Sequence, residues 1–165
     1  SDLGSWMYYN MSAAARSTFT EWTMNDLKST IDDLEKKATS NQTHFELMRW
    51  LVKLNGWYSR KAEIQGMLLN KYEGNPSDSS IIMKRIQSCM EELKILRDDY
   101  KGLWMKTNKP DNLYLVEDKF NRMLAYLSEI YGQLAIGKLK PPVIESKWIY
   151  AKTTDTTYAP RAVFR

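Results

Sequence analysis

The strongest constraint on this chain is a pair of regular apolar repeats that stand on either side of one short turn. In both repeats, apolar or aromatic residues recur in steps of three and four, which places them on one face of an α-helix. Residues 107–112, which include Pro110, separate the repeats and end the first helix. Two such helices predict an antiparallel pair with packing close to that of a coiled coil. The first repeat consists of Ile82, Ile86, Cys89, Leu93, Leu96, Tyr100 and Leu103, and the second of Leu113, Val116, Phe120, Met123, Leu127, Ile130 and Leu134.

Two further helices are predicted upstream, each from one apolar stripe. The first is expected to begin after Thr23 or Asn25. The second is expected to begin at Thr43-x-x-Glu46, which has the form of a capping box, and to continue to about Tyr72. The first stripe consists of Leu27, Ile31, Leu34 and Ala38, and the second of Leu47, Leu51, Leu54, Tyr58, Ile64, Leu68 and Tyr72.

The segments around these helices carry their own signals. Residues 3–22 are rich in alanine and aromatic residues and predict another helix, packed closely against a neighbour. Residues 73–78 predict a turn in which Asp78 or a serine beside it caps the next helix. Gly137 is expected to end the last helix, because two prolines follow it closely.

The end of the chain has a different composition. Residues 145–151 and 162–165 are typical of strands around a Thr-rich turn. Two short strands do not make an independent domain. Two interpretations therefore stay open: the tail is the start of a further β module that this chain truncates, or it is a flap along the helices. The unfinished pattern at residues 162–165 favours the first.

Composition agrees with these patterns. The chain has 165 residues, 43% of them hydrophobic, with only 7 Gly and 5 Pro, which suits one core and few turns. We therefore predict an all-α fold, an antiparallel bundle of about four to five helices over residues 1–137. A tail with strand character over residues 138–165 completes the chain. No apolar run approaches the roughly 18–20 residues that cross a bilayer, so no membrane span is expected.

The net charge does not favour a nucleic-acid partner. The chain carries a formal charge of +4, and the residues from Lys138 onward hold six Lys or Arg against two Asp or Glu. This surplus accounts for the whole net charge, so residues 1–137 are neutral. Basic and acidic residues also alternate along the predicted helices, which leaves no basic helix face for a phosphate backbone.

Residues with metal or nucleophilic chemistry are scarce. Cys89 is the only cysteine and His44 the only histidine, so neither an intrachain disulfide nor a cysteine zinc site is possible. We expect His44 to be an exposed residue in the first turn of a helix, and Cys89 to fill the core with the methionines near it. Glycine-rich phosphate loops and the hydrolase elbow G-x-S-x-G do not occur. No catalytic residue, cofactor or metal is therefore expected.

Aromatic residues supply the candidate binding site. The chain has six Trp and ten Tyr, and aromatic rings stack on sugar faces as readily as they fill a core. Trp57, Tyr58 and Trp104, near the cationic side chains of Arg60 and Lys106, are the candidates for an edge that binds substrate. Packing in the core or at a domain interface is the alternative for the same rings.

One segment resembles a known family. Residues 96–110, LRDDYKGLWMKTNKP, followed by Asn112 and Leu113, are similar to a helix and turn found after the catalytic barrel in some bacterial family 20 glycoside hydrolases. The family pattern there is L-R-x-x-Y-x-x-L-W-x-x-x-N-[KR]-P-x-x-L. Residues 54–63 resemble the long helix before this hairpin. Residues 147–150 and 161–165 look like the beginning of an attached β-sandwich module.

This resemblance implies a function in the degradation of carbohydrates. The family has β-N-acetylhexosaminidase activity, in which an Asp-Glu pair on a (β/α)8 barrel works with the substrate's own acetamido group. This chain has no His-x-Gly-Gly-Asp-Glu stretch, and 165 residues are too few for a barrel of about 250 residues. The expectation is a non-catalytic accessory domain that packs on the barrel and borders the sugar site, with residues 1–22 as candidates for the barrel's end.

The same resemblance implies the partners and the compartment. The partners would be the barrel and β module of the same parent chain and glycans that contain N-acetylhexosamine, in the bacterial periplasm or outside the cell. The alternative function is a free-standing helical protein–protein interaction module, with the repeats over residues 82–103 or 113–134 paired between chains. A self-contained enzyme is a third hypothesis, for which the sequence offers no group of polar residues.

Overall fold

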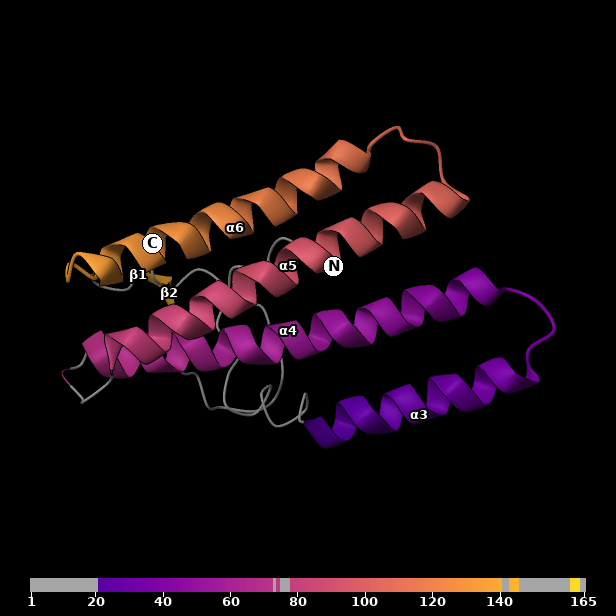
Figure 1. Ribbon diagram of the computed structural model, residues 1–165, viewed down its shortest axis with the longest axis horizontal. Helices are drawn as coiled ribbons and strands as arrows, with labels where there is room; N and C mark the ends of the chain where they lie inside the picture. Colours follow the sequence, from indigo (N-terminus) through magenta and orange to yellow (C-terminus); the bar gives the residue numbers. More distant parts are fainter. Residues whose placement is uncertain (1–20, 73, 75–77, 141–142, 146–160, 164–165) are drawn as a thin grey trace.

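The structure is a bundle of antiparallel helices. The computed structural model describes residues 21–72, 74, 78–140, 143–145 and 161–163. Its helices lie side by side in chain order, with α3 at one edge of the array and α6 at the other (Figure 1). The predicted all-α bundle is therefore confirmed, while the helix predicted over residues 3–22 falls almost entirely outside the described residues. The elements are α3 (Glu21–Lys37), α4 (Gln42–Tyr72), α5 (Ser79–Thr107), α6 (Leu113–Ala135), β1 (Val143–Glu145) and β2 (Arg161–Val163).

The two apolar repeats form the centre of the core, as predicted. Ile82, Ile86, Cys89, Leu93 and Leu96 of α5 are buried. They belong to one cluster with the apolar stripe of α6 and with residues of α4. Burying these rows removes several hundred Å² of apolar surface from water, at about 25 cal/mol per Å². The buried apolar residues of α6 are Leu113, Phe120, Met123, Leu127, Ile130 and Leu134.

The predicted stripe of α4 is wrong in its first half. Leu47 and Leu51 are exposed, and so is Tyr72 at the end of the helix. Two tryptophans take their place, because each buried indole N–H finds an acceptor on α5. Trp50 Nε1 donates to the carbonyl of Leu96 and Trp57 Nε1 to that of Cys89, both at 2.8 Å. The row that faces the core is Trp50, Leu54, Trp57, Lys61, Ile64 and Leu68, in steps of four and three.

The helix ends confirm some sequence signals and correct one. Asp78 caps α5, since its carboxylate accepts from the backbone N–H of Ser80 at 2.7 Å. Gly137 has a φ of +66° and closes α6 with a bond to the carbonyl of Leu134 at 3.1 Å. The capping box at Thr43 is not formed, because α4 already begins at Gln42, and Glu46 instead binds Lys106 at 2.6 Å.

The turn between α5 and α6 is closed by the last turn of α5. The backbone N–H of Asn108 donates to the carbonyl of Trp104 at 2.8 Å. The indole N–H of Trp104 donates to the carbonyl of Lys109, also at 2.8 Å. Asn112, with a φ of +68°, then starts α6. The predicted break at residues 107–112 is thus confirmed.

The tail contains a short antiparallel strand pair. Val143 lies opposite Val163, and Glu145 lies opposite Arg161. The strands were expected at residues 145–151 and 162–165, so each begins earlier than predicted; the remaining residues of both ranges lie outside the described part. None of the described helices combines the length and apolarity needed to cross a membrane.

Matched isoleucines on α5 test the packing. Ile86 is 0% exposed and Ile95 is 60% exposed. We expect Ile86→Ala to lower the free energy of unfolding by about 2–5 kcal/mol, because it leaves a cavity in the core. Ile95→Ala should change it by less than about 0.5 kcal/mol. Urea unfolding followed by far-UV circular dichroism measures both, and equal effects would contradict the assignment of the buried face.

Candidate functional site

Two of the four candidate binding residues belong to the core. Trp57 is 0% exposed, and its indole binds the α5 carbonyl of Cys89. Tyr58 is also buried, and its ring lies edge-on to Trp57 at 5.5 Å between centroids. A ring buried on both faces offers no platform for a sugar. In this arrangement, both aromatic residues therefore take the alternative that the sequence left open, core packing.

The other two candidates lie on the surface and far from each other. Arg60 is exposed and donates from Nε to Glu92 of α5 at 2.8 Å. Trp104 is half-buried in the turn that it closes. From Glu92 to Trp104 is about 18 Å along α5, at a rise of about 1.5 Å per residue. The structure therefore does not bring the four predicted residues together at one edge.

His44 lies where the sequence places it. It is exposed in the first turn of α4, and its backbone N–H donates to the carbonyl of Asn41 at 2.9 Å. Within the part of the chain that the structure describes, no three His, Cys, Asp or Glu residues come close enough together to hold a metal ion.

A buried polar cluster is the feature that the sequence analysis missed. Lys61 is 2% exposed, and Gln65, one turn later, is buried beside it. The amide of Gln65 donates to the hydroxyl of Tyr126 on α6 at 2.7 Å. Neither Lys61 Nζ nor Gln65 Oε1 has a hydrogen-bond partner among the described residues. We name Tyr58, Lys61, Gln65 and Tyr126 the interior polar cluster.

The environment disfavours the charged forms of this cluster. Burial lowers the pKa of Lys61 from its ordinary value of 10.5 to about 7. Burial also raises the pKa of Cys89, Tyr58 and Tyr126 to about 12. Among the described residues, no carboxylate forms a hydrogen bond with Lys61 Nζ that would stabilise an ammonium ion. At neutral pH the groups around Lys61 are therefore neutral, and its amine can accept a proton only at a cost.

A sequence signal for this cluster existed. Lys61 stands four residues after Trp57 and three before Ile64, so it continues the core row of α4. A stripe defined only by apolar residues passes over it, because lysine is almost never fully buried without a partner. Lys61 stands seven residues after the buried Leu54, as Ile64 does after Trp57, so a repeat of this spacing would have predicted its position.

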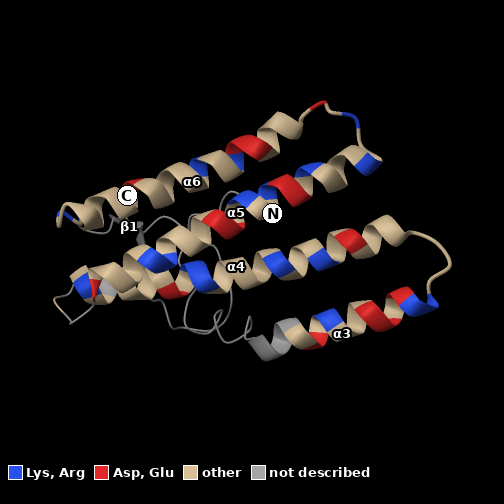
Figure 2. Cartoon of the chain, in the orientation of Figure 1, with Lys and Arg blue, Asp and Glu red and all other residues tan. Residues whose placement is uncertain are grey.

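Three ion pairs join α4 to α5 at seven-residue spacing. Glu46, Lys53 and Arg60 recur every seven residues on α4, and their partners recur every seven residues on α5. Each pair is partly exposed and contributes little stability by itself. Figure 2 shows Lys and Arg mixed with Asp and Glu along the helices, as expected from the sequence. The partners in the same order are Lys106, Asp99 and Glu92.

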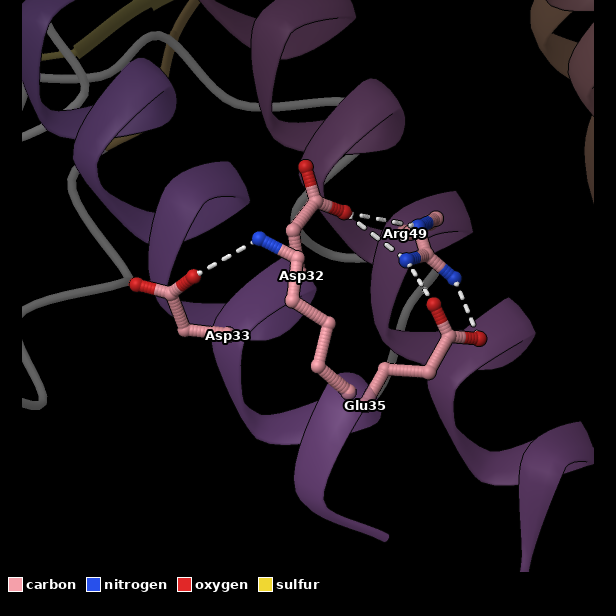
Figure 3. Close-up of polar contacts among 5 residues, drawn as sticks. Asp32, Asp33, Glu35 and Arg49 are labelled. Atoms are coloured by element: carbon pink, nitrogen blue, oxygen red, sulfur yellow. Dashed lines mark hydrogen bonds and ion pairs between the residues drawn. The ribbon is translucent and has the colours of Figure 1, made fainter.

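A second charged group attaches α3 to α4. Arg49 of α4 binds two carboxylates of α3, Asp32 and Glu35 (Figure 3). Its Nη2 lies 2.8 Å from Asp32 Oδ1, and its Nη1 lies 3.0 Å from Glu35 Oε1. The hydrogen bonds from Arg49 hold the pKa of both carboxyls below the usual range. We name these three residues the Arg49 clamp.

Known proteins do not identify the chain. Comparisons with protein families, with curated proteins and with solved structures find no match to it.

Removal of the buried amine should flatten the dependence of stability on pH. The pKa of Lys61 is lower in the folded chain, so folding is favoured above pH 10.5 and loses stability as pH falls toward about 7. The slope is about 1.4 kcal/mol per pH unit. Lys61→Met should remove this component and raise the free energy of unfolding at neutral pH by about 2–4 kcal/mol. Urea unfolding at several pH values measures it; parallel curves for the two proteins would refute it.

The Arg49 clamp should make the attachment of α3 sensitive to acid. Because the pKa of both carboxyls is lower in the folded chain, the ionised carboxylates stabilise the fold above the ordinary carboxyl pKa of about 4. This contribution to stability is lost as the pH falls through the lowered pKa values. Arg49→Gln should return both pKa values toward normal and speed amide exchange in α3. NMR titration and hydrogen exchange report these changes. Arg122→Gln, which removes an exposed pair with Asp118 on α6, is the control and should leave α3 unchanged.

Proposed function

We propose that this chain is a non-catalytic helical accessory domain of a glycoside hydrolase similar to β-N-acetylhexosaminidases. It would pack on the catalytic barrel of the parent protein and border its sugar site. The observation that carries this proposal is the role of the residues in the segment that resembles the family. Their side chains build the hairpin between α5 and α6, so the motif reads as a structural one.

Several apolar and aromatic positions of that motif have packing contacts. Leu96 is buried and its carbonyl accepts the indole N–H of Trp50. Tyr100 lies 4.7 Å from the ring of Trp50 and 6.0 Å from that of Trp104, between ring centroids. Leu113 is buried at the start of α6. A motif whose apolar and aromatic positions stabilise one helix pair suits a domain that supports a neighbour rather than one that performs chemistry.

An exposed apolar set offers the surface for such a neighbour. Among the described elements α3 packs chiefly against α4, and its two leucines, Leu27 and Leu34, are 42% and 51% exposed. The first half of α4 adds three more exposed residues, Leu47, Met48 and Leu51. Exposed apolar side chains that lie close together are typical of contact surfaces. In this proposal the five residues of α3 and α4 face the barrel, while Arg60 and Trp104 lie too far apart to form one sugar edge.

The interaction-module alternative now has less support. It relied on the repeats over residues 82–103 and 113–134 pairing between chains. Both repeats face the interior of one bundle, together with the core row of α4. For this alternative, the exposed leucines of α3 are the surface through which a partner chain would bind.

The coding sequence on both sides of the chain tests the proposal. We expect an upstream barrel that contains a Gly-Asp-Glu active-site strand, and a β module downstream. A start codon directly before Ser1 and a stop codon directly after Arg165 would contradict the accessory domain.

A variant of the parent protein tests the proposed surface. Leu34→Asp should lower the melting temperature of the barrel, because a charge would be buried in the contact. Ile95→Asp is the matched control, since Ile95 is 60% exposed on α5, away from α3. Equal melting temperatures for the two variants would show that α3 does not pack on the barrel.

A further inference from the structure

Lys61 occupies a core position that an apolar residue would normally fill. It lies in the same row of α4 as Trp57 and Ile64, which are 0% and 2% exposed, and is itself 2% exposed. In antiparallel helices packed by seven-residue repeats, side chains of this row insert between those of the facing helix. Its charged form therefore has no route to water while the helices stay packed.

The groups around Lys61 do not supply a counter-charge. On its own helix, the next charged residue toward α5 is Arg60, which is bound to Glu92 of α5. From α6, Glu129 acts electrostatically on Tyr126 of the interior polar cluster, and it binds Lys140 at 3.1 Å. The charged contact of α3 with α4, the Arg49 clamp, lies about 18 Å away along α4. The uncharged titratable groups around it are Tyr58 on α4, Cys89 on α5 and Tyr126 on α6.

Across from Lys61 lies the thiol of Cys89. The two side chains influence each other electrostatically, and Cys89 is 2% exposed in the facing row of α5. The carbonyl of Cys89 also accepts the indole N–H of Trp57, which fixes this level of the α4–α5 contact. Separation of the helices at Lys61 would therefore expose Cys89.

We propose that the core row at Lys61 is a proton-dependent opening site, at which uptake of a proton by the lysine amine separates α4 from α5 and α6 locally and exposes Cys89. The driving force is the hydration of the ammonium ion, which only the open form allows. This inference is independent of the proposed function.

The pH range of the opening follows from linkage. The amine has its ordinary pKa of 10.5 in the open form and about 7 in the closed form. Between these two pKa values only the open form binds the proton. The ratio of open to closed chains therefore rises about tenfold for each unit by which the pH decreases. Below about pH 7 both forms carry the proton, and the ratio becomes constant.

Thiol labelling measures this opening directly, because Cys89 is the only cysteine. The folded chain would be treated with a pyridyl disulfide reagent and the labelling rate of Cys89 measured. The protection factor is the labelling rate of an unstructured peptide thiol at the same pH divided by that of Cys89. It should fall about a hundredfold from about pH 9 to about pH 7 and then level off.

Two variants make the test specific. Lys61→Met introduces an unbranched apolar side chain, one heavy atom shorter and without a titratable group, so its protection factor should be higher than that of the wild type at neutral pH and independent of pH. Lys94→Met removes an exposed lysine of α5 that takes no part in the ion pairs between α4 and α5, and should behave as the wild type does. A wild-type protection factor that does not change with pH, or the same fall in Lys61→Met, would overturn the proposal.

Discussion

The alignment of α4 against α5 is the constraint on which the rest of the structure depends. Two tryptophans, seven residues apart on α4, donate their indole N–H groups to carbonyls that are seven residues apart on α5. Each bond fixes both the axial position and the rotation of one helix against the other. Three ion pairs repeat at the same spacing along the edge of this contact. The row of α6 then packs on the surface that the aligned pair creates.

The alignment explains why a lysine is tolerated in the core. With Trp50 and Trp57 bound to α5, the row of α4 has to continue through residue 61, whatever residue stands there. Burial of an amine without a partner lowers stability, and the surrounding apolar contacts offset this cost. Burial in the bundle favours the neutral form of Lys61 over the charged form. Local stability and proton binding are therefore linked at this one level of the core.

The fold could be predicted from sequence wherever a helix has a purely apolar row. The rows of α5 and α6 have one, so their pairing, their turn and the caps at Asp78 and Gly137 were all predicted. The row of α4 mixes indoles, leucines and one lysine, and apolarity alone selects Leu47 and Leu51 instead. Indole rings whose N–H groups find a carbonyl acceptor are buried because of this hydrogen bond as well as because they are hydrophobic. A stripe of apolar residues does not reveal such hydrogen bonds.

The candidate site was predictable only in part, for a related reason. Aromatic residues next to cationic residues in the sequence are typical both of a sugar-binding edge and of the border of a hydrophobic core. Only the burial of the rings distinguishes the two. Trp57 and Tyr58 are buried, while Arg60 is used in an ion pair with α5. The interior polar cluster joins residues of α4 to Tyr126 of α6. Such a contact depends on how three helices are rotated, which the spacing within each helix does not specify.

The order of the charges along α4 also restricts where this helix can stop against α5. From its first turn onward the three paired positions read negative, positive, positive, and their partners read positive, negative, negative. A slip by one heptad would keep an apolar row in contact with an apolar row. In one direction it would bring Glu46 opposite Asp99, and in the other Lys53 opposite Lys106, and each slip would leave one pair of opposite charges from this set instead of three. The order of these charges therefore favours the observed alignment over the two nearest wrong ones, although each pair is weak by itself.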